Sequence, residues 1–217
     1  LATRECPVLF APEIARGLVG HLVGAVSGGA LYRRASFLLD HAGKAIMPAW
    51  LHIDEKPHLK RGHASGNFDG EGVATRDSAL VQGGVLARYV LGSYSARKLG
   101  LASTGNAGGI HNLAVTPGAA DGEASDFAGM LRRLGTGLLV TEVMGQGVNT
   151  ITGDYSRGAA GFWVENGAIA YPVEEITIAA NLRDMYADVR AVGADVDPRS
   201  HILCGSILVD RMTVAGE

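Results

Sequence analysis

The chain has 217 residues, with 19 basic and 22 acidic side chains and a formal net charge of −3. This balance provides no electrostatic footprint for nucleic acid or for an anionic membrane surface. No apolar run reaches the roughly 18 residues of a membrane span, and the first residues lack the pattern of a signal peptide. We therefore expect one soluble domain over residues 1–217, with no nucleic-acid or membrane partner.

The cysteine and glycine content indicates the compartment and the type of fold. Cys6 and Cys204 are the only cysteines, and their spacing fits neither a disulfide framework nor a zinc finger, which favours the cytoplasm. Cys204 lies among apolar residues and is predicted to be in the core. The 31 glycines are about twice the usual share of about 7%. Their positions among β-prone residues predict turns and bulges of a sheet protein.

The first elements are a strand and a helix. Residues 8–10 form a short apolar run that predicts a strand. Pro12 and Glu13 suit the first turn of a helix, and apolar residues recur every fourth position over residues 14–26. The sequence Ser27-Gly28-Gly29 is predicted to end this helix.

The next part of the chain, residues 30–76, is rich in proline and glycine and predicts long loops. Two β-prone runs around a pair of glycines predict a hairpin. The expected elements are a short strand at 51–53, hairpin strands at 79–81 and 85–91 around Gly83-Gly84, and a short helix at 93–99.

The C-terminal half predicts more strands than helices. Its strongest turn signal is Asn166-Gly167, since both residues tolerate positive φ. The expected strands are 112–116, 137–143, 159–165, 168–173, 189–192 and 207–214, and the expected helices are 126–133, capped by Ser125 or Asp126, and 181–187. We therefore predict an α+β fold with a large, twisted, mostly antiparallel sheet, partly barrel-like, and a few covering helices.

Metal-binding residues are the first candidates for chemistry. The zinc protease pattern HExxH is absent, and a lone helical histidine such as His21 is usually a packed or surface residue, so His21 is only a weak metal candidate. A polar segment (residues 52–63) contains further residue types that bind zinc or manganese. Their irregular spacing favours a solvated loop, with a metal site as the alternative. These residues are His52, Asp54, Glu55, His58 and His63.

A glycine-rich run over residues 144–175 holds the peptide-binding candidates. Asp154, Tyr155 and Arg157 are predicted to lie in one turn, where together with Gln146 they could clamp the carbonyls, charged side chains or terminus of a peptide. The competing hypothesis is an internal turn between Asp154 and Arg157 that only fixes the hairpin.

The same run resembles a known family. Residues 144–149, 152–167 and 171–179 are similar to the C-terminal signature of the TldD/PmbA family, once labelled modulators of DNA gyrase, in its PmbA-type (TldE-type) branch. Further similar blocks lie between Gly20 and Ser206, so the resemblance spans nearly the whole chain. It implies that the chain is the C-terminal domain, and the first residue, Leu1, suggests a piece of a longer chain whose N-terminal domain is absent.

The resemblance also implies a function. Members of this family form a cytoplasmic heterodimer of TldD-type and TldE-type subunits, a metalloprotease that degrades unfolded or short peptides, matures peptide antibiotics and cleaves the antitoxin CcdA. The TldD-type subunit binds its metal with an HExxxH motif and a later cysteine. Here Arg16 and Gly17 stand in place of the first histidine and the glutamate, and only His21 remains. The expected cofactor, zinc or another divalent metal, therefore belongs to the TldD-type partner, and this chain is expected to be non-catalytic alone.

Two alternatives remain open. One is a self-sufficient metallopeptidase that uses His21 with the polar segment. The other is a non-proteolytic regulator that binds DNA gyrase, for which the sequence offers no dedicated feature.

Overall fold

The computed structural model describes residues 2–216. The helices are α1 (Pro12–Ala25), α2 (Gly28–Tyr32), α3 (Ser93–Leu99), α4 (Phe127–Leu134) and α5 (Leu182–Ala187). The strands are β1 (Arg4–Phe10), β2 (Ile53–Glu55), β3 (Ser78–Gln82), β4 (Val85–Leu86), β5 (Leu113–Val115), β6 (Gly118–Ala119), β7 (Gly137–Met144), β8 (Asp154–Glu165), β9 (Ala168–Asn181), β10 (Val189–Val192), β11 (Ile202–Leu203) and β12 (Ile207–Ala215).

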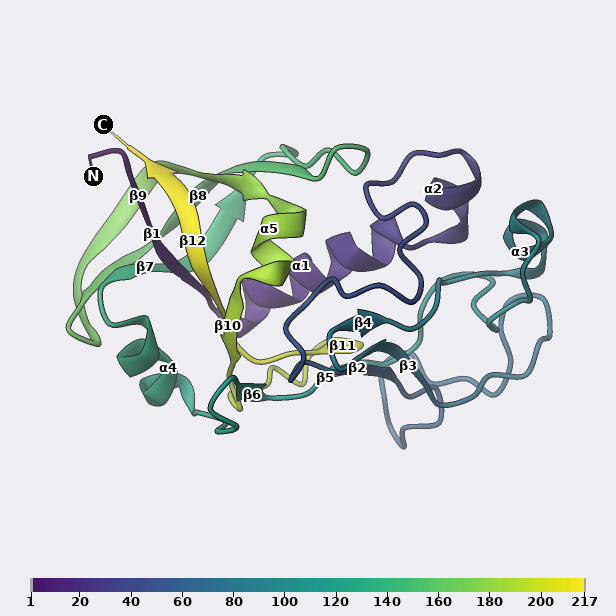
Figure 1. The fold of residues 1–217 in the computed structure, drawn as a ribbon. Helices are drawn as coiled ribbons and strands as arrows, with labels where there is room; N and C mark the ends of the chain where they lie inside the picture. Colours follow the sequence, from purple (N-terminus) through teal and green to yellow (C-terminus); the bar gives the residue numbers. More distant parts are fainter. Residues whose placement is uncertain (1, 217) are drawn as a thin grey trace.

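The strands form two sheets, and the expected α+β class is confirmed (Figure 1). Within residues 2–216, one sheet has seven strands in the order β1-β7-β8-β9-β12-β10-β6, and the other has five in the order β11-β5-β2-β3-β4. The additional pairing of β1 with β12 closes part of the larger sheet into a barrel. β10 and β6 continue this sheet from β12, whereas the strands between residues 53 and 115 pair with one another in the smaller sheet.

The barrel interior follows from the period-two pattern of its strands. β1 pairs parallel to β7 and antiparallel to β12, with Val8 opposite both Leu138 and Val209. All three side chains are fully buried. Cys204 is also buried, which confirms its predicted place in the core.

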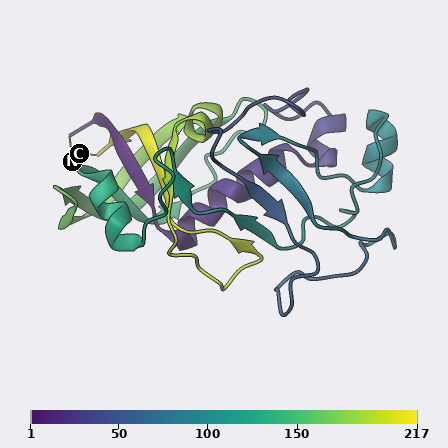
Figure 2. The ribbon, with the colours of Figure 1, turned by 60° about the horizontal axis from the view of Figure 1, so that its bottom comes forward.

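Helix α1 lies between the two sheets (Figures 1 and 2). Leu18 and Leu22 are buried in a core shared with both sheets, as the apolar residues at every fourth position predicted. Val19 is buried beside them, and Pro12 begins the helix. The predicted end needs a correction. α1 stops at Ala25, and Ser27 instead begins α2 by accepting a bond from the Ala30 amide at 3.4 Å, because a serine at this position can cap a new helix.

The other predicted elements are largely confirmed. The predicted helices at 93–99, 126–133 and 181–187 are α3, α4 and α5, and Asp126 Oδ1 accepts from the Gly129 amide at 2.8 Å. Asn166 and Gly167 have φ of 52° and 76° and form the tight turn between β8 and β9. In the described part of the chain, no helix has both the length and the apolar character needed to cross a bilayer.

Candidate functional site

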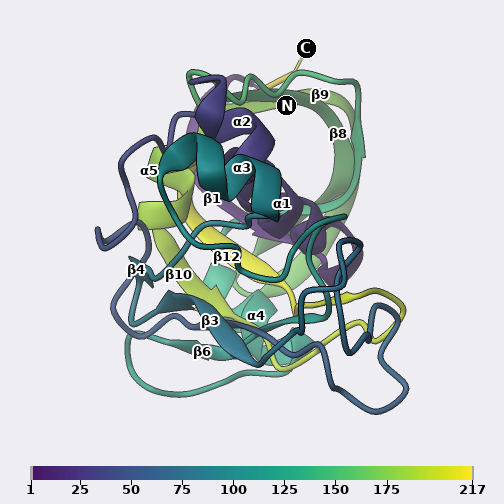
Figure 3. The same cartoon turned by 90° about the vertical axis from the view of Figure 1, so that its right-hand side faces the viewer.

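One face of α1 is open. Gly17, Gly20, His21 and Gly24 share this face, since residues three and four positions apart lie above one another on a helix. A Cβ atom built at any of these glycines meets no other atom within 4 Å. Figure 3 shows α1 beside the curved wall of β8 and β9, and α2 packs against α1.

Arg16, at the edge of this face, is engaged in an ion-pair network. Its Nη1 lies 3.3 Å from Oδ2 of the buried Asp197. Arg199 Nε also donates to Asp197 at 2.8 Å, and Arg199 Nη2 reaches Glu13 Oε1 at 2.7 Å. The hydrogen bonds from Arg199 and the charges of Arg199 and Arg16 lower the pKa of Asp197 against the effect of burial. The network ties the start of α1 to the segment that precedes β11.

His21 contacts an aromatic ring. Its imidazole meets the ring of Tyr155 edge-on, with centroids 6.0 Å apart and an interplanar angle of 73°. Burial lowers the pKa of His21, and the positive charge of Arg157 lowers it further. Burial raises the pKa of Tyr155 to about 12. At neutral pH, His21 is therefore mainly an uncharged imidazole beside a neutral phenol.

The peptide-binding candidates on β8 do not form the predicted turn. Asp154, Tyr155 and Arg157 are the first residues of a strand, where neighbouring side chains point to opposite sides of the sheet. Asp154 is consequently exposed, whereas Tyr155 is buried. The predicted turn is wrong because the surrounding glycines indicated a loop. Pairing with β9 instead extends the strand to Asp154.

The competing internal turn between Asp154 and Arg157 is also wrong. Asp154 Oδ2 accepts from Thr152 Oγ1 at 2.6 Å. Arg157 Nε donates to the Met144 carbonyl at 3.0 Å. Each side chain therefore fixes a different part of the connection that joins β7 to β8.

That connection borders an open cleft of about 480 Å³, which we call the Gln146 cleft. Its lining includes Gln146 and Asp154 but neither Tyr155 nor Arg157. The loop is held against β8, since the Ser156 amide donates to the Gly147 carbonyl at 2.7 Å and a Cβ at Gly147 would collide with the Ser156 carbonyl oxygen. Two of the four candidate residues therefore share a cleft, and Tyr155 instead faces His21.

The histidines of the polar segment are dispersed. His52 Nδ1 accepts from the Gly83 amide at 3.3 Å, and His58 Nε2 lies 3.0 Å from Thr75 Oγ1. His63 is exposed. Within residues 2–216, no three His, Cys, Asp or Glu side chains form a group that could hold a metal ion. The chain does not assemble the predicted alternative site from His21 and the polar segment.

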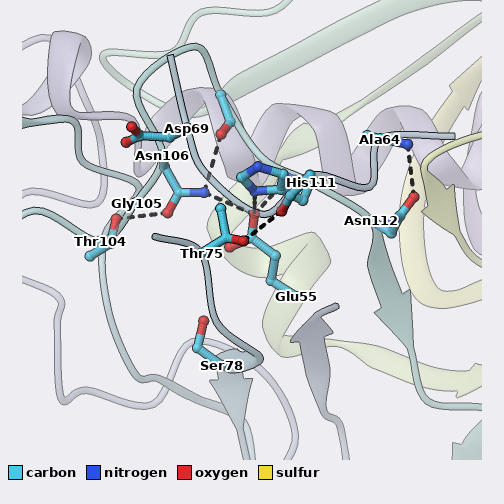
Figure 4. A network of polar contacts seen from close by, with 12 residues as sticks. Glu55, Ala64, Asp69, Thr75, Ser78, Thr104, Gly105, Asn106, His111 and Asn112 are labelled. Atoms are coloured by element: carbon cyan, nitrogen blue, oxygen red, sulfur yellow. Dashed lines mark hydrogen bonds and ion pairs between the residues drawn. The ribbon is translucent and has the colours of Figure 1, made fainter. Parts of the chain in front are cut away.

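A buried polar network, absent from the sequence predictions, surrounds Glu55 (Figure 4). Glu55 Oε1 accepts from Asn106 Nδ2 at 2.8 Å and from His111 Nδ1 at 3.0 Å, and Arg88 Nη2 pairs with Oε2. Asn106 Oδ1 in turn accepts from Thr104 Oγ1 at 2.7 Å. Glu55 was named only as a member of the polar segment, because its burial depends on loops distant in sequence.

Asp69 is a second buried carboxylate beside this network. It accepts three backbone bonds of 2.9 Å, from the amides of Glu71, Val73 and Ala107. Burial alone would raise the pKa of Asp69, but these amides, together with the charge of His111, lower it on balance. Together the two carboxylates fix the loop around Ala107, which no motif in the sequence indicated.

Comparison with protein families identifies relatives across the whole chain. A family described as the PmbA/TldA metallopeptidase C-terminal domain matches residues 3–216. The chain is 57% identical over 217 residues to "Metalloprotease PmbA" of Escherichia coli O157:H7 and 56% identical over 216 residues to a homologue in Haemophilus influenzae. In both cases the match covers 100% of this chain and 47% of the relative. The chain thus spans about half the length of these curated relatives.

Solved structures agree with the fold. The crystal structure of a Bacteroides thetaiotaomicron protein that is described as a modulator of DNA gyrase matches with a TM-score of 0.92 and 28% identity. The match covers 100% of this chain and 48% of that one. A second such structure, from Thermotoga maritima, matches with a TM-score of 0.89 and 33% identity, over 99% of this chain and 50% of that one. TldE from Thermococcus kodakarensis, at 24% identity and a TM-score of 0.85, matches 100% of this chain and 51% of its own and supports the fold alone.

Proposed function

Because the chain belongs to the PmbA/TldD metallopeptidase family, we propose that it is the C-terminal domain of a subunit in a cytoplasmic metalloprotease complex that degrades unfolded or short peptides. In this proposal the catalytic metal belongs to a TldD-type partner subunit. This chain contributes part of the wall of the peptide chamber.

The environment of α1 carries the proposal. A structural or catalytic zinc site needs three or four nitrogen, sulfur or oxygen ligands. The open face of α1 offers one imidazole, His21, and the guanidinium of Arg16 is paired with Asp197 at its edge. The positive charge of Arg157 acts on His21. A single imidazole ligand beside the positive charge of Arg157 opposes binding of a divalent metal, so the residues present do not fit the metal that the family name implies.

The Gln146 cleft supports a role in peptide binding. Gln146 offers amide donor and acceptor groups on a loop held by main-chain bonds to β8, and Asp154, the first residue of β8, offers a carboxylate. Such groups can hydrogen-bond the main chain of a peptide with little dependence on its sequence. Polar groups on a fixed loop are typical of binding sites supported by a rigid scaffold.

Mixing the chain with a purified TldD-type subunit tests the proposal. We expect cleavage of an unfolded peptide in the mixture and little cleavage by the chain alone. Metal analysis of each component should place stoichiometric zinc in the TldD-type subunit. Tightly bound zinc and peptide hydrolysis in the isolated chain would contradict the proposal. Stable capture of DNA gyrase without any cleavage in the mixture would instead support the regulatory alternative.

A further inference from the structure

A second cleft lies beside α2 and α3, which pack together at one end of the molecule (Figure 1). Its volume is about 360 Å³, near the lower end of the range of about 300–1,000 Å³ for small-ligand sites. We call it the glycine cleft, since glycines of three separate segments line it. This size suits one or two amino-acid residues better than a folded partner.

The loop of residues 106–109, which forms the floor of the glycine cleft, is held in place by buried polar groups. The loop residue Ala107 donates its amide to Asp69 Oδ2 at 2.9 Å and accepts from the Gly70 amide at 2.8 Å. Its neighbour Asn106 is bound by Glu55 and by Thr104 (Figure 4). A loop ordered by buried carboxylates loses little further conformational entropy when a ligand binds.

Two glycines of this loop, Gly108 and Gly109, expose backbone without side chains. Gly108 and Gly109 have φ of 104° and 119°, which L-residues rarely adopt, and a Cβ at either would meet no atom within 4 Å. Both glycines are exposed, so a ligand's main chain can approach this backbone closely. The amide and carbonyl of Gly109 are already bonded to Asn106, at 3.0 and 3.1 Å.

Two tyrosines form one side of the cleft. The rings of Tyr32 and Tyr94 meet edge-to-face, with centroids 5.7 Å apart and an interplanar angle of 82°. Tyr94 is 52% exposed although it lines a cleft. Lys98 Nζ lies 5.7 Å from the Tyr94 ring and Arg33 Cζ lies 5.3 Å from the Tyr32 ring. These contacts show that both rings attract cationic groups.

A single carboxylate sets the charge of the lining. Among the described residues that line the glycine cleft, Glu71 is the only charged one. Its Oε2 accepts from the Ser93 amide at 2.7 Å, and hydrogen bonds from Ser93 lower its pKa, so it is ionised at neutral pH. The carboxylate is exposed and can accept further hydrogen bonds from a ligand. A carboxylate next to aromatic rings recognises an ammonium group.

We propose that the glycine cleft binds the amino-terminal residue of a peptide. The α-ammonium group pairs with Glu71, the first side chain packs against Tyr94, and the main chain runs over Gly108 and Gly109. This inference rests on the proposed function in taking peptides as the ligand class, and it adds a contact separate from the Gln146 cleft.

The test uses the 217-residue chain, labelled with ¹⁵N and titrated with trialanine or with N-acetylated trialanine. We expect chemical-shift changes at the amides of Tyr94, Gly108 and Gly109, with at least tenfold weaker binding of the acetylated peptide. Glu71→Gln keeps an acceptor for Ser93 but removes the charge, and it should weaken binding of trialanine about tenfold. Tyr94→Ala should also weaken it.

Matched controls come from β9, where Glu174 and Tyr171 are exposed. Glu174→Gln and Tyr171→Ala should leave the affinity unchanged. Equal affinity for both peptides, full affinity of the Glu71→Gln variant, or shifts confined to the Gln146 cleft would overturn the inference. Such a failure leaves the proposed function standing, because cleavage in the mixture with a TldD-type subunit is measured independently of this binding.

Discussion

The hydroxyl of Tyr186 in α5 donates a 2.8 Å hydrogen bond to the Leu18 carbonyl oxygen in the middle of α1. Both residues are buried. Burial, and to a lesser degree the neighbouring Tyr155, raises the pKa of Tyr186 far above its ordinary value. This bond joins the helix that follows the barrel wall to the central helix.

Tyr186→Phe removes this hydrogen bond and almost no volume. We expect a loss of about 1 kcal/mol in the free energy of unfolding, or about 2–4 °C in Tm for a chain of this size. Thermal and urea unfolding measure the change. The control is Tyr171→Phe on the exposed part of β9, which should leave Tm unchanged, and an unchanged Tm for Tyr186→Phe would contradict the role of this bond.

Gly17→Ala should stabilise the protein. Glycine inside a helix costs roughly 0.5–1 kcal/mol relative to alanine, and the new Cβ meets no atom within 4 Å. Gly147→Ala should destabilise the protein, because its Cβ collides with the Ser156 carbonyl oxygen. The two variants should shift Tm in opposite directions. A lower Tm for Gly17→Ala would show that the open face of α1 is more crowded than its geometry indicates.

His21 should titrate below its ordinary pKa of 6.5, because burial and then the charge of Arg157 disfavour its protonated form. A group whose folded-state pKa is depressed contributes stability above its unfolded pKa and loses it as the pH falls. His21→Gln should therefore reduce the loss of stability below about pH 6.5, whereas His63→Gln, at an exposed position, should not. An NMR titration of Arg157→Ala should show a higher His21 midpoint that burial still keeps below the ordinary value.

Asp197→Asn tests the network at the start of α1. Because Arg199 and Arg16 lower the pKa of Asp197, its contribution is complete above the ordinary pKa of 3.8 and is lost as the pH falls through the folded-state value. The variant should be about 1 kcal/mol less stable than the parent at pH 7, and this difference should shrink toward pH 3. A difference that does not change with pH would show that packing, not charge, explains the effect.

Glu55→Gln should be strongly destabilising. Glu55 is 2% exposed and pairs with Arg88 and His111, so its neutral replacement leaves a buried guanidinium without its anion, at a cost of about 3 kcal/mol. Hydrogen exchange should accelerate first in the loop around Ala107, which the network holds. Glu174→Gln, at an exposed position, provides the control. Unchanged exchange near Ala107 would mean that the network does not order this loop.

The sequence by itself determined the local elements. Apolar residues at every fourth position after Pro12 predicted α1, and Asn166-Gly167 predicted the β8–β9 turn. Ser125 or Asp126 was predicted to cap α4, and Asp126 is the cap. Each of these signals depends on residues close together in the chain, where backbone preference and hydrogen bonding act directly. The resemblance to the family depended on such short blocks as well.

Only the tertiary structure decided which side chains meet. Pairing with β9 turned the expected loop at Asp154 and Tyr155 into a strand and directed Tyr155 toward His21. Glu55 and Asn106, 51 positions apart, share a buried hydrogen bond that no local pattern encodes. Contacts of this kind depend on how distant segments pack and exclude water, and that arrangement is set by the whole fold.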